Sequence, residues 1–375
     1  MKKLGFGLMR LPLTNGDRKT PDLEKTAQMA DRFLERGFTY FDTAYMYHDG
    51  ESERVVRSVL SDRVPRESFL LADKMPIYQM EKDEQEEIFR EQLEKTGAGY
   101  FDYYLLHSIS GGYLPTLEEW GSFEFLKKKQ QEGKIRHIGF SFHGTPEGLD
   151  EILTRYPGFE FVQLQINYLD WDSSRIQSRR CYEVARKHGK DIIVMEPVKG
   201  GTLAEIPAGA KAILDACTPG MSPASWAIRW VASLPGVILV LSGMSTLEQV
   251  EDNLSFMEDF QPLNEAEQEA IRKVTPLVRA GQIIPCTACS YCVDGCPQNI
   301  PIPEIFRVCN ADYRHAAGNA DEAADGTNSA YVRYADAVRG RGSAASCLAC
   351  GRCEAVCPQQ IEIIKELRKA ANMFE

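Results

Sequence analysis

The chain has 375 residues, of which 43% are hydrophobic, and a formal net charge of -11. This length suits one large core with a small appendage, so we expect two domains. The acidic balance and the lack of a clustered run of Lys and Arg argue against a nucleic-acid partner, because phosphate binding draws on such clusters.

The beginning of the chain and its apolar runs give no sign of export or membrane insertion. Lys2 and Lys3 open the chain, but Arg10 and nearby glycines interrupt the apolar core that a signal peptide needs. No uncharged run reaches the roughly 20 apolar residues of a membrane-spanning helix. We therefore expect a soluble, cytoplasmic protein with no membrane partner.

The first 280 residues alternate short apolar or β-branched runs with amphipathic stretches. Between the expected strands, helices are predicted at 83–95, 117–131, 173–187 and 246–256, and a last helix begins at Asn264, which can cap it together with Glu267. No GxGxxG follows the first strand, so a closed (β/α)8 TIM barrel is favoured over an open doubly wound sheet. The expected strands are residues 4–8, 38–42, 69–73, 103–106, 135–140, 159–165, 192–195 and 237–241.

Polar residues recur where these apolar runs stop. In a barrel, the chemistry lies at the carboxyl ends of the strands. Each residue alone has a structural explanation, as a loop cap, a solvated charge or a buried core histidine, but their recurrence at converging positions favours a site. The set is Asp42, Lys74, His107, Ser141, His143, Gln163 and Asn167.

This set has the groups that carbonyl reduction requires. When a hydride reaches a carbonyl carbon, the developing alkoxide needs a proton from a positioned acid, and Tyr47 is the candidate. Lys74 could stabilise the phenolate of Tyr47, while Asp42 orients Lys74. His107 would hold the substrate oxygen.

Four separated motifs in this order resemble the aldo-keto reductase family. They are Phe-Asp-Thr-Ala at 41–44 with Tyr47 and Gly-Glu-Ser-Glu at 50–53, then Lys74, then Leu-Leu-His-Ser at 105–108, and Ile-Gly-Phe-Ser at 138–141. The resemblance spans residues 1–280 and implies a barrel domain over that range. It also implies that Asp42, Tyr47, Lys74 and His107 are the catalytic tetrad and that the substrate is a small carbonyl compound or alcohol.

The resemblance further implies a nicotinamide cofactor, NADP or NAD. Ser141 and Gln163 would hold the nicotinamide carboxamide, and Met195 stands where an aromatic residue often stacks on the nicotinamide. The chain departs from the family pattern at His48, after the tyrosine, and at Phe142 and His143, after the serine. We expect these departures to alter the substrate range.

The pyrophosphate is expected at the loops that follow the last two strands, where backbone amides at a helix start can cradle phosphate. The residue that would usually bind a 2′-phosphate is an arginine, and its position is held by Gln249, so a preference for NADPH is not predicted. The cofactor-binding candidates here are Gly200, Gly201, Gly243, Ser245, Gln249 and Asn253.

Nine of the eleven cysteines crowd into the last quarter of the chain. Two runs read CxxCxxCxxxCP, which is typical of 4Fe-4S binding in a reducing compartment. Zinc also uses CxxC pairs, but it gives no reason for two runs of four that each end in proline. The leftover Cys309 is expected to be a small buried apolar residue. The runs are Cys286, Cys289, Cys292 and Cys296, then Cys347, Cys350, Cys353 and Cys357.

These runs resemble a two-cluster bacterial ferredoxin, which implies a ferredoxin-like domain at 281–375. In that arrangement the fourth cysteine of each run binds the other cluster. One cluster would then take Cys286, Cys289, Cys292 and Cys357, and the other Cys347, Cys350, Cys353 and Cys296.

Two functions remain open. The first is a nicotinamide-dependent oxidoreductase, in which the clusters are structural, sense redox state, or relay electrons to a bound flavin or a radical-forming substrate. An electron-transfer protein is a candidate partner of this enzyme. Hydride carries two electrons and each cluster accepts one, so a relay from the cofactor needs a converter such as a flavin, for which no motif is evident. The second is a redox-sensing or partner-docking protein with a non-catalytic barrel. Neither the substrate nor the oligomeric state follows from the sequence.

Overall fold

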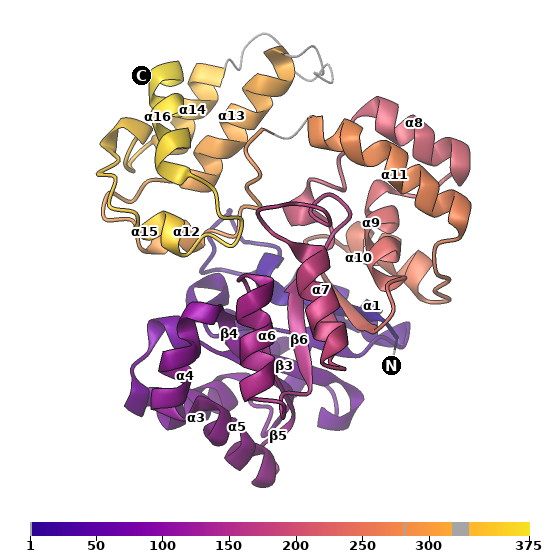
Figure 1. The fold of residues 1–375 in the computed structure, drawn as a ribbon, viewed down its shortest axis with the longest axis vertical. Coiled ribbons are helices and arrows are strands. Elements are labelled where there is room, and N and C mark those ends of the chain that lie inside the picture. Colours follow the sequence, from indigo (N-terminus) through magenta and orange to yellow (C-terminus); the bar gives the residue numbers. More distant parts are fainter. Residues whose placement is uncertain (1, 281–282, 317–329) are drawn as a thin grey trace. The chain divides into compact units, whose positions relative to one another are not determined.

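The structure is a computed structural model that describes residues 2–280, 283–316 and 330–375 (Figure 1). The described chain forms two compact units, which we take in turn. The first contains Met1–Ser173, Gln177–Pro197 and Ala224–Asn264, and the second contains Ser174–Ile176, Val198–Pro223 and Glu265–Glu375.

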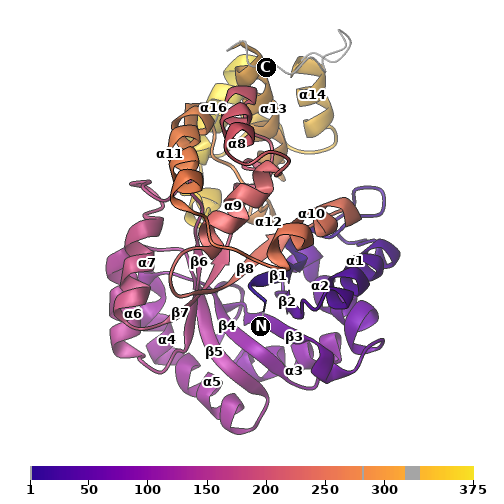
Figure 2. The same cartoon turned by 90° about the vertical axis from the view of Figure 1, so that its right-hand side faces the viewer.

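The first unit is a closed parallel barrel of eight strands in sequential order (Figure 2). Closure is made by β1 and β8, which pair with Leu4 opposite Val240 and Gly7 opposite Gly243. This pairing excludes the open doubly wound sheet, and all eight predicted strands are confirmed within a few residues. The strands are β1 Leu4–Gly7, β2 Tyr40–Asp42, β3 Leu70–Met75, β4 Phe101–Ile109, β5 Ile135–Phe142, β6 Phe161–Gln165, β7 Asp191–Met195 and β8 Val237–Gly243.

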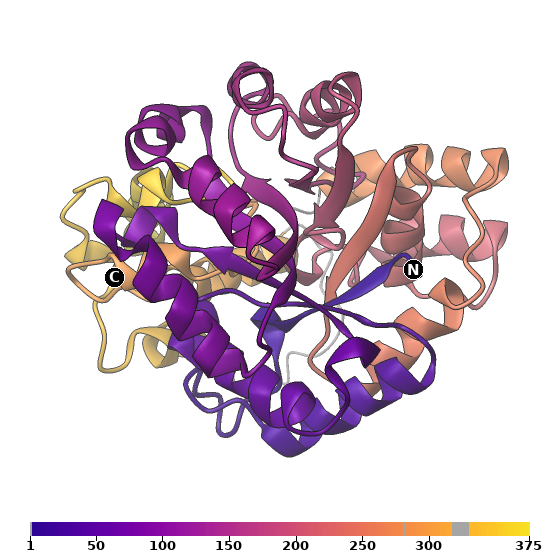
Figure 3. The ribbon, with the colours of Figure 1, turned by 90° about the horizontal axis from the view of Figure 1, so that it is seen from below.

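Apolar side chains fill the barrel, so it is a packed core and not a pore. A buried layer joins side chains from six strands, among them Tyr40, Leu105, Phe161, Ile193 and Leu239. Because the alternate residues of each strand face outward, the other apolar positions meet the surrounding helices, which Figure 3 shows packed around the strands. The polar strand ends are therefore held by a rigid frame.

The helices follow the predicted amphipathic stretches, with two differences. The stretch at 117–131 is split because Gly121 takes a left-handed conformation, φ 61°, between α4 and α5. The stretch at 173–187 becomes helical only at Ser178, because Gln177 before it is also left-handed, φ 56°. The main helices of this unit are α1 Leu23–Glu35, α2 Ser52–Val56, α3 Gln85–Thr96, α4 Leu114–Trp120, α5 Ser122–Gln131, α6 Pro146–Arg155, α7 Ser178–Lys187, α9 Pro223–Ala232 and α10 Leu247–Met257.

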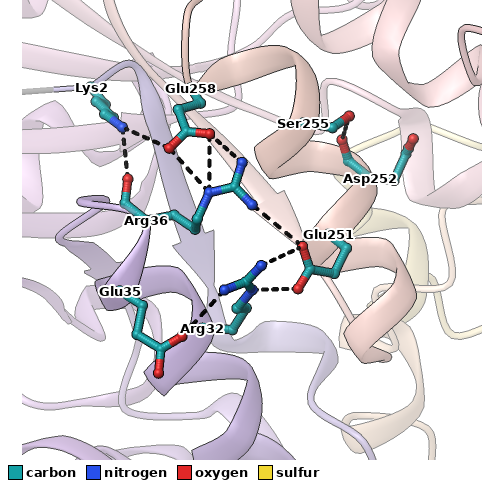
Figure 4. A network of polar contacts seen from close by, with 8 residues as sticks. All are labelled: Lys2, Arg32, Glu35, Arg36, Glu251, Asp252, Ser255 and Glu258. Atoms are coloured by element: carbon teal, nitrogen blue, oxygen red, sulfur yellow. Dashed lines mark hydrogen bonds and ion pairs between the residues drawn. The ribbon is translucent and has the colours of Figure 1, made fainter.

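Ion pairs join the first and last of these helices, α1 and α10, where the barrel closes (Figure 4). Arg32 bonds Glu251, and Arg36 bonds Glu258 and lies 3.7 Å from Glu251. These side chains are about a third exposed, so we expect each pair to contribute less than about 1 kcal/mol of stability.

The second unit combines a helix pair with a small cysteine-rich core. The helix pair is α8 Ala208–Cys217 and α11 Glu265–Ala280, and α11 begins directly after Asn264, as predicted. Ile300, Phe306, Tyr334 and Leu367 form the apolar centre of the core, and the cysteines pack against it. The remaining helices are α12 Tyr291–Asp294, α13 Ile302–Ala316, α14 Ala330–Val338, α15 Arg352–Ala355 and α16 Ile363–Phe374. Among the residues described here, no helix has the length and apolarity needed to cross a membrane.

Candidate active site and cluster-binding pockets

Four of the predicted site residues come together at the carboxyl ends of β2, β3 and β4. Lys74 Nζ lies 2.5 Å from Asp42 Oδ1 and 2.6 Å from the carbonyl oxygen of Thr43. The same Nζ lies 4.9 Å from the ring centroid of Tyr47, in the 3-10 helix η2 Tyr47–Gly50. The rings of Tyr47 and His107 meet edge to face at 6.0 Å. The arrangement places one buried cation and one imidazole beside the same phenol ring.

The charge of Lys74 is fixed by its surroundings. Burial favours the neutral amine, but the carboxylate of Asp42 and the nearby Tyr47 outweigh it and raise the pKa of Lys74 above 10.5. Lys74 is therefore an ammonium at any ordinary pH. A fixed positive charge beside a phenol favours its ionised form, which is what a proton donor of high pKa needs.

His107 lies in a setting that keeps its ring neutral. It is 3% exposed, and burial, followed by the charge of Lys74 and then by His143, holds the pKa of His107 well below 6.5. Burial also lowers the pKa of His143 to about 4. Two neutral imidazoles can offer N–H donors to an oxygen without themselves titrating near neutral pH.

Tyr78 also lies beside this group, although the sequence analysis did not predict it. It lies in the 3-10 helix η5 Ile77–Gln79, just past β3, with its ring 5.5 Å from that of His107. Its hydroxyl donates to the sulfur of Met46. The tyrosine follows no recognisable motif, so only the fold could place it beside His107.

His48, which departs from the family pattern, has main-chain contacts at both of its ring nitrogens. His48 has a left-handed backbone, φ 55°, and is 5% exposed. Its Nε2 lies 3.3 Å from Leu11 N and 3.1 Å from Leu8 O, and its Nδ1 lies 3.2 Å from Arg18 O. Both ring nitrogens therefore bind main chain and hold the segment after β1 in place.

Ser141 and Gln163 are neighbours in the barrel wall, paired in register between β5 and β6. Ser141 Oγ accepts a hydrogen bond from Ser108 N at 2.7 Å. Gln163 is 2% exposed, and its Oε1 has no hydrogen-bond partner among the described residues. A buried amide oxygen of this kind fits an N–H donor such as a nicotinamide carboxamide. Met195 ends β7, two strands along the wall from Ser141.

Four of the predicted cofactor residues lie at the end of β8, in the loop after it and in α10. Gln249 Oε1 accepts from Ser245 N at 2.7 Å, so the side chain folds back over the start of α10. Asn253 Nδ2 donates to Ser242 Oγ at 2.7 Å, which ties the helix to the end of β8. Gly243 is the last residue of β8, four residues before α10 begins.

Arg10 is a second residue that the sequence did not reveal. It ends the 3-10 helix η1 Leu8–Arg10, and its carbonyl oxygen accepts from Ser245 Oγ at 2.7 Å. A Cβ built on Gly243 would lie 3.2 Å from Cδ of Arg10, so the arginine stem runs along this glycine. Arg10 is 235 residues from Ser245 in the sequence, so no local motif could indicate that it lies beside this loop.

Gly200 and Gly201, the remaining predicted cofactor residues, belong to the second unit. Gly200 has φ 63°, and a Cβ there would lie 2.5 Å from the carbonyl oxygen of Thr287. The close approach explains the glycine by packing, and its part in cofactor binding stays a prediction.

The eight motif cysteines surround two pockets in the second unit. We call them the Cys286 pocket and the Cys347 pocket; their empty volumes are about 320 and about 340 Å³. Each pocket takes three cysteines from one run and the fourth from the other, which is the predicted crossing. The Cys286 pocket has Cys286, Cys289, Cys292 and Cys357, and the Cys347 pocket has Cys347, Cys350, Cys353 and Cys296.

The surroundings of these thiols include a backbone donor that suits an iron-sulfur cluster. Among the described residues, no three His, Cys, Asp or Glu side chains converge closely enough to bind one metal ion. Backbone N–H groups point at the sulfurs, as Ala288 N does at 3.4 Å from Cys286 Sγ. Such donors stabilise thiolate and cluster sulfur. The leftover Cys309 is 2% exposed in the core, as predicted.

Comparison with known proteins gives a family match for each of two stretches of the chain. Residues 3–276 match the aldo/keto reductase family, and residues 285–362 match a 4Fe-4S dicluster domain. An aldo-keto reductase of Mycolicibacterium vanbaalenii is 30% identical over 226 residues, which cover 60% of this chain and 75% of that protein. The NADH-specific methylglyoxal reductase of Escherichia coli is 25% identical over 304 residues, covering 68% of this chain and 89% of that protein.

Solved structures share the barrel. An aldo-keto reductase of Bacillus halodurans in its holo form has a TM-score of 0.59 at 26% identity, covering 72% of this chain and 91% of that one. An aldo-keto reductase from Klebsiella pneumoniae, in complex with NADP and acetate, has a TM-score of 0.60 at 23% identity, covering 73% of this chain and 91% of that one. This similarity supports only the assignment of the fold. With the match over 3–276, the chain belongs to the aldo/keto reductase family and carries a 4Fe-4S dicluster domain after its barrel.

Proposed function

We propose that the barrel, residues 1–280, reduces an aldehyde or ketone, or oxidises the matching alcohol, with a nicotinamide cofactor. In the same proposal the ferredoxin-like domain, residues 281–375, binds two 4Fe-4S clusters. One observation carries the first part: the buried ion pair of Lys74 and Asp42 lies against the ring of Tyr47, and His107 faces that ring.

The cofactor, when bound, supplies the hydride that the carbonyl carbon receives. Tyr47 gives the proton that the substrate oxygen then needs, and the ammonium of Lys74 stabilises the phenolate left behind. Asp42 holds Lys74 charged and in place. His107, neutral because it is buried, donates an N–H to the same oxygen and orients the substrate.

Ser141 and Gln163 hold the nicotinamide carboxamide in this proposal, and Met195 lies against the nicotinamide ring. Ser245, just before the start of α10, and Gly243 bind the phosphates in this proposal. Gln249, Asn253, Gly200 and Gly201 are further candidates. Arg10 offers the positive charge that an additional phosphate requires. Both forms of the cofactor occur among the similar proteins, one named as NADH-specific and one solved with NADP.

The cysteine sets of the Cys286 and Cys347 pockets would bind one cluster each. We propose that these clusters carry single electrons to or from a partner electron-transfer protein, since Cys350 is exposed at the surface of this unit. A direct exchange with the nicotinamide would need a one-to-two electron converter such as a flavin. No similar protein reported above is named as a flavoprotein.

Replacement of Tyr47 by Phe tests the enzyme. We expect turnover of a panel of aldehydes and ketones, followed by nicotinamide absorbance, to fall about 10²- to 10⁴-fold while cofactor binding persists. Tyr45→Phe is the matched control, because the Tyr45 hydroxyl bonds Glu91 at 3.1 Å and takes no part in the tetrad. Equal turnover in both variants would favour the alternative, a redox-sensing or partner-docking protein with a non-catalytic barrel.

The cluster role is tested by an anaerobic spectrum of the reconstituted protein before and after NADH or NADPH, without mediator. We expect no bleaching of the cluster absorbance by the nicotinamide alone and full bleaching by dithionite or a reduced one-electron carrier protein. Bleaching by the nicotinamide would show that the barrel and the clusters exchange electrons directly.

A further inference from the structure

The two cysteine runs form an internal repeat, offset by 61 residues from Cys286 to Cys347. The backbone follows the repeat: Ala288 and Ala349 both have φ 52°, and Asn299 and Gln360 have φ 50° and 49°. By the same offset, Gln298 corresponds to Gln359. Each glutamine follows a Cys-Pro pair and lines the pocket of that cysteine. The repeat thus places one amide at each pocket.

The two amides differ in their surroundings. Gln298, at the Cys347 pocket, is exposed. Gln359, at the Cys286 pocket, is 2% exposed, and its Oε1 accepts a hydrogen bond from Nζ of Lys199 at 3.1 Å. Lys199 is itself 1% exposed and belongs to the same compact unit. Burying a charged side chain is unfavourable, so this contact calls for an explanation beyond packing.

The lysine decides which way the amide points. An ammonium group only donates hydrogen bonds, so the amide oxygen must face Lys199 and the amide nitrogen must face away from it. Gln359 Nε2 is buried and has no hydrogen-bond partner among the described residues. The pocket that Gln359 lines contains four cysteine sulfurs, which are acceptors once they bind iron.

The backbone around Lys199 is shaped to hold this contact. Lys199, Gly200 and Gly201 are all left-handed, with φ 47°, 63° and 100°. The conformation is unfavourable for a lysine, and Gly200 is held against the main chain of Thr287, which also lines the Cys286 pocket. Lys199 therefore combines a strained backbone with a buried charge beside the Cys286 pocket.

We propose that Lys199 and Gln359 raise the reduction potential of the cluster in the Cys286 pocket above that of the cluster in the Cys347 pocket. Gln359 donates an N–H to a cluster sulfur, and Lys199 orients the amide and adds a positive charge. One-electron reduction adds one negative charge, which both groups stabilise. The first electron therefore rests in the Cys286 pocket. This inference depends on the cysteine sets of the proposed function.

The test is a redox titration of the full-length, anaerobically reconstituted protein, followed by electron paramagnetic resonance. Gln359→Glu keeps the size of the side chain and its contact with Lys199 but removes the N–H donor. We expect it to lower one of the two midpoint potentials by at least about 59 mV, which for one electron is a tenfold change in the reduced-to-oxidised ratio. The other midpoint potential should stay unchanged. Lys199→Met should lower the same potential as Gln359→Glu. Gln298→Glu is the matched control, and we expect a smaller change, confined to the other cluster.

Cys350→Ala assigns the signals, because it should remove the cluster of the Cys347 pocket and leave the signal that Gln359→Glu shifts. Iron content separates the two proposals. Two clusters of four irons each give eight irons in the chain, and a wild-type content well below that would overturn the proposed function. Eight irons with equal potentials in wild type and Gln359→Glu would overturn this inference alone, as would a shift in the signal that Cys350→Ala abolishes.

Discussion

Lys74 donates from Nζ to Asp42 Oδ1 across 2.5 Å, and the side chains of the pair are 1% and 3% exposed. Such a pair is a weak source of net stability, but losing one member leaves a buried charge without compensation. The pair is therefore a point where the site and the stability of the barrel depend on each other.

Lys74→Met should destabilise the protein by about 3–5 kcal/mol in urea unfolding. Adding Asp42→Asn to it should restore part of that loss, because the uncompensated carboxylate is removed. Lys25→Met is the control: Lys25 pairs with Asp22 at the surface and is 67% exposed, so its loss should change stability by less than about 1 kcal/mol. Equal effects of Lys74→Met and Lys25→Met would contradict the prediction.

The low pKa values of His107 and His143 predict how stability depends on pH. Folded His143 has a pKa near 4, and that of His107 is also below the ordinary 6.5. Between 6.5 and about 4, the unfolded chain takes up protons that the folded chain refuses, so stability falls as pH falls through this window and is unaffected above it. In His143→Gln, the urea midpoint should fall less between about pH 7 and 5 than in wild type. An identical fall in both would show that His143 does not carry the effect.

Much of this site could be predicted because it lies on strand ends. Asp42, Lys74 and His107 each follow an apolar run, and parallel strands bring such ends together whatever the loops do. Arg10 and Tyr78 could not be predicted, since they lie on short 3-10 turns and their neighbours Gly243 and His107 are distant in sequence. The crossing of Cys357 into the Cys286 pocket was expected from the resemblance to a two-cluster ferredoxin, whereas the contact of Lys199 with Gln359 has no local pattern.

Replacing Gln163 should affect protein stability and nicotinamide binding in opposite directions. Its Oε1 is buried without a hydrogen-bond partner among the described residues, and an unsatisfied buried acceptor is unfavourable by about 1–3 kcal/mol. Gln163→Met should leave the cofactor-free protein as stable or more stable, and should weaken nicotinamide binding about tenfold in fluorescence titration. A less stable variant that binds the cofactor normally would indicate a structural role for the amide.

Arg10 should discriminate between the two forms of the cofactor. If its guanidinium binds an additional phosphate, Arg10→Met should raise the KM for NADPH by about 10- to 100-fold, which corresponds to one charge-assisted hydrogen bond or two. The KM for NADH should change little. The carbonyl oxygen of Arg10 that holds Ser245 is main chain and survives the substitution. An equal rise for both cofactors would place the effect in the loop and not in phosphate recognition.

Replacement of Cys309 and replacement of Cys350, both in the second unit, should differ in their effects on iron content and stability. Cys309 is 2% exposed on α13, and burial raises its pKa to about 11, so it is an unreactive thiol within the apolar core. Cys350 is exposed and lines the Cys347 pocket. Cys309→Ala should keep the full iron content and lose about 1 kcal/mol of stability, because it removes one sulfur from a packed core. Cys350→Ala should lose about half of the iron, since three thiolates hold a cluster poorly where four are needed. Iron and sulfide analysis of both variants after identical reconstitution distinguishes them, and loss of iron from Cys309→Ala with retention in Cys350→Ala would reverse the assignment of ligands.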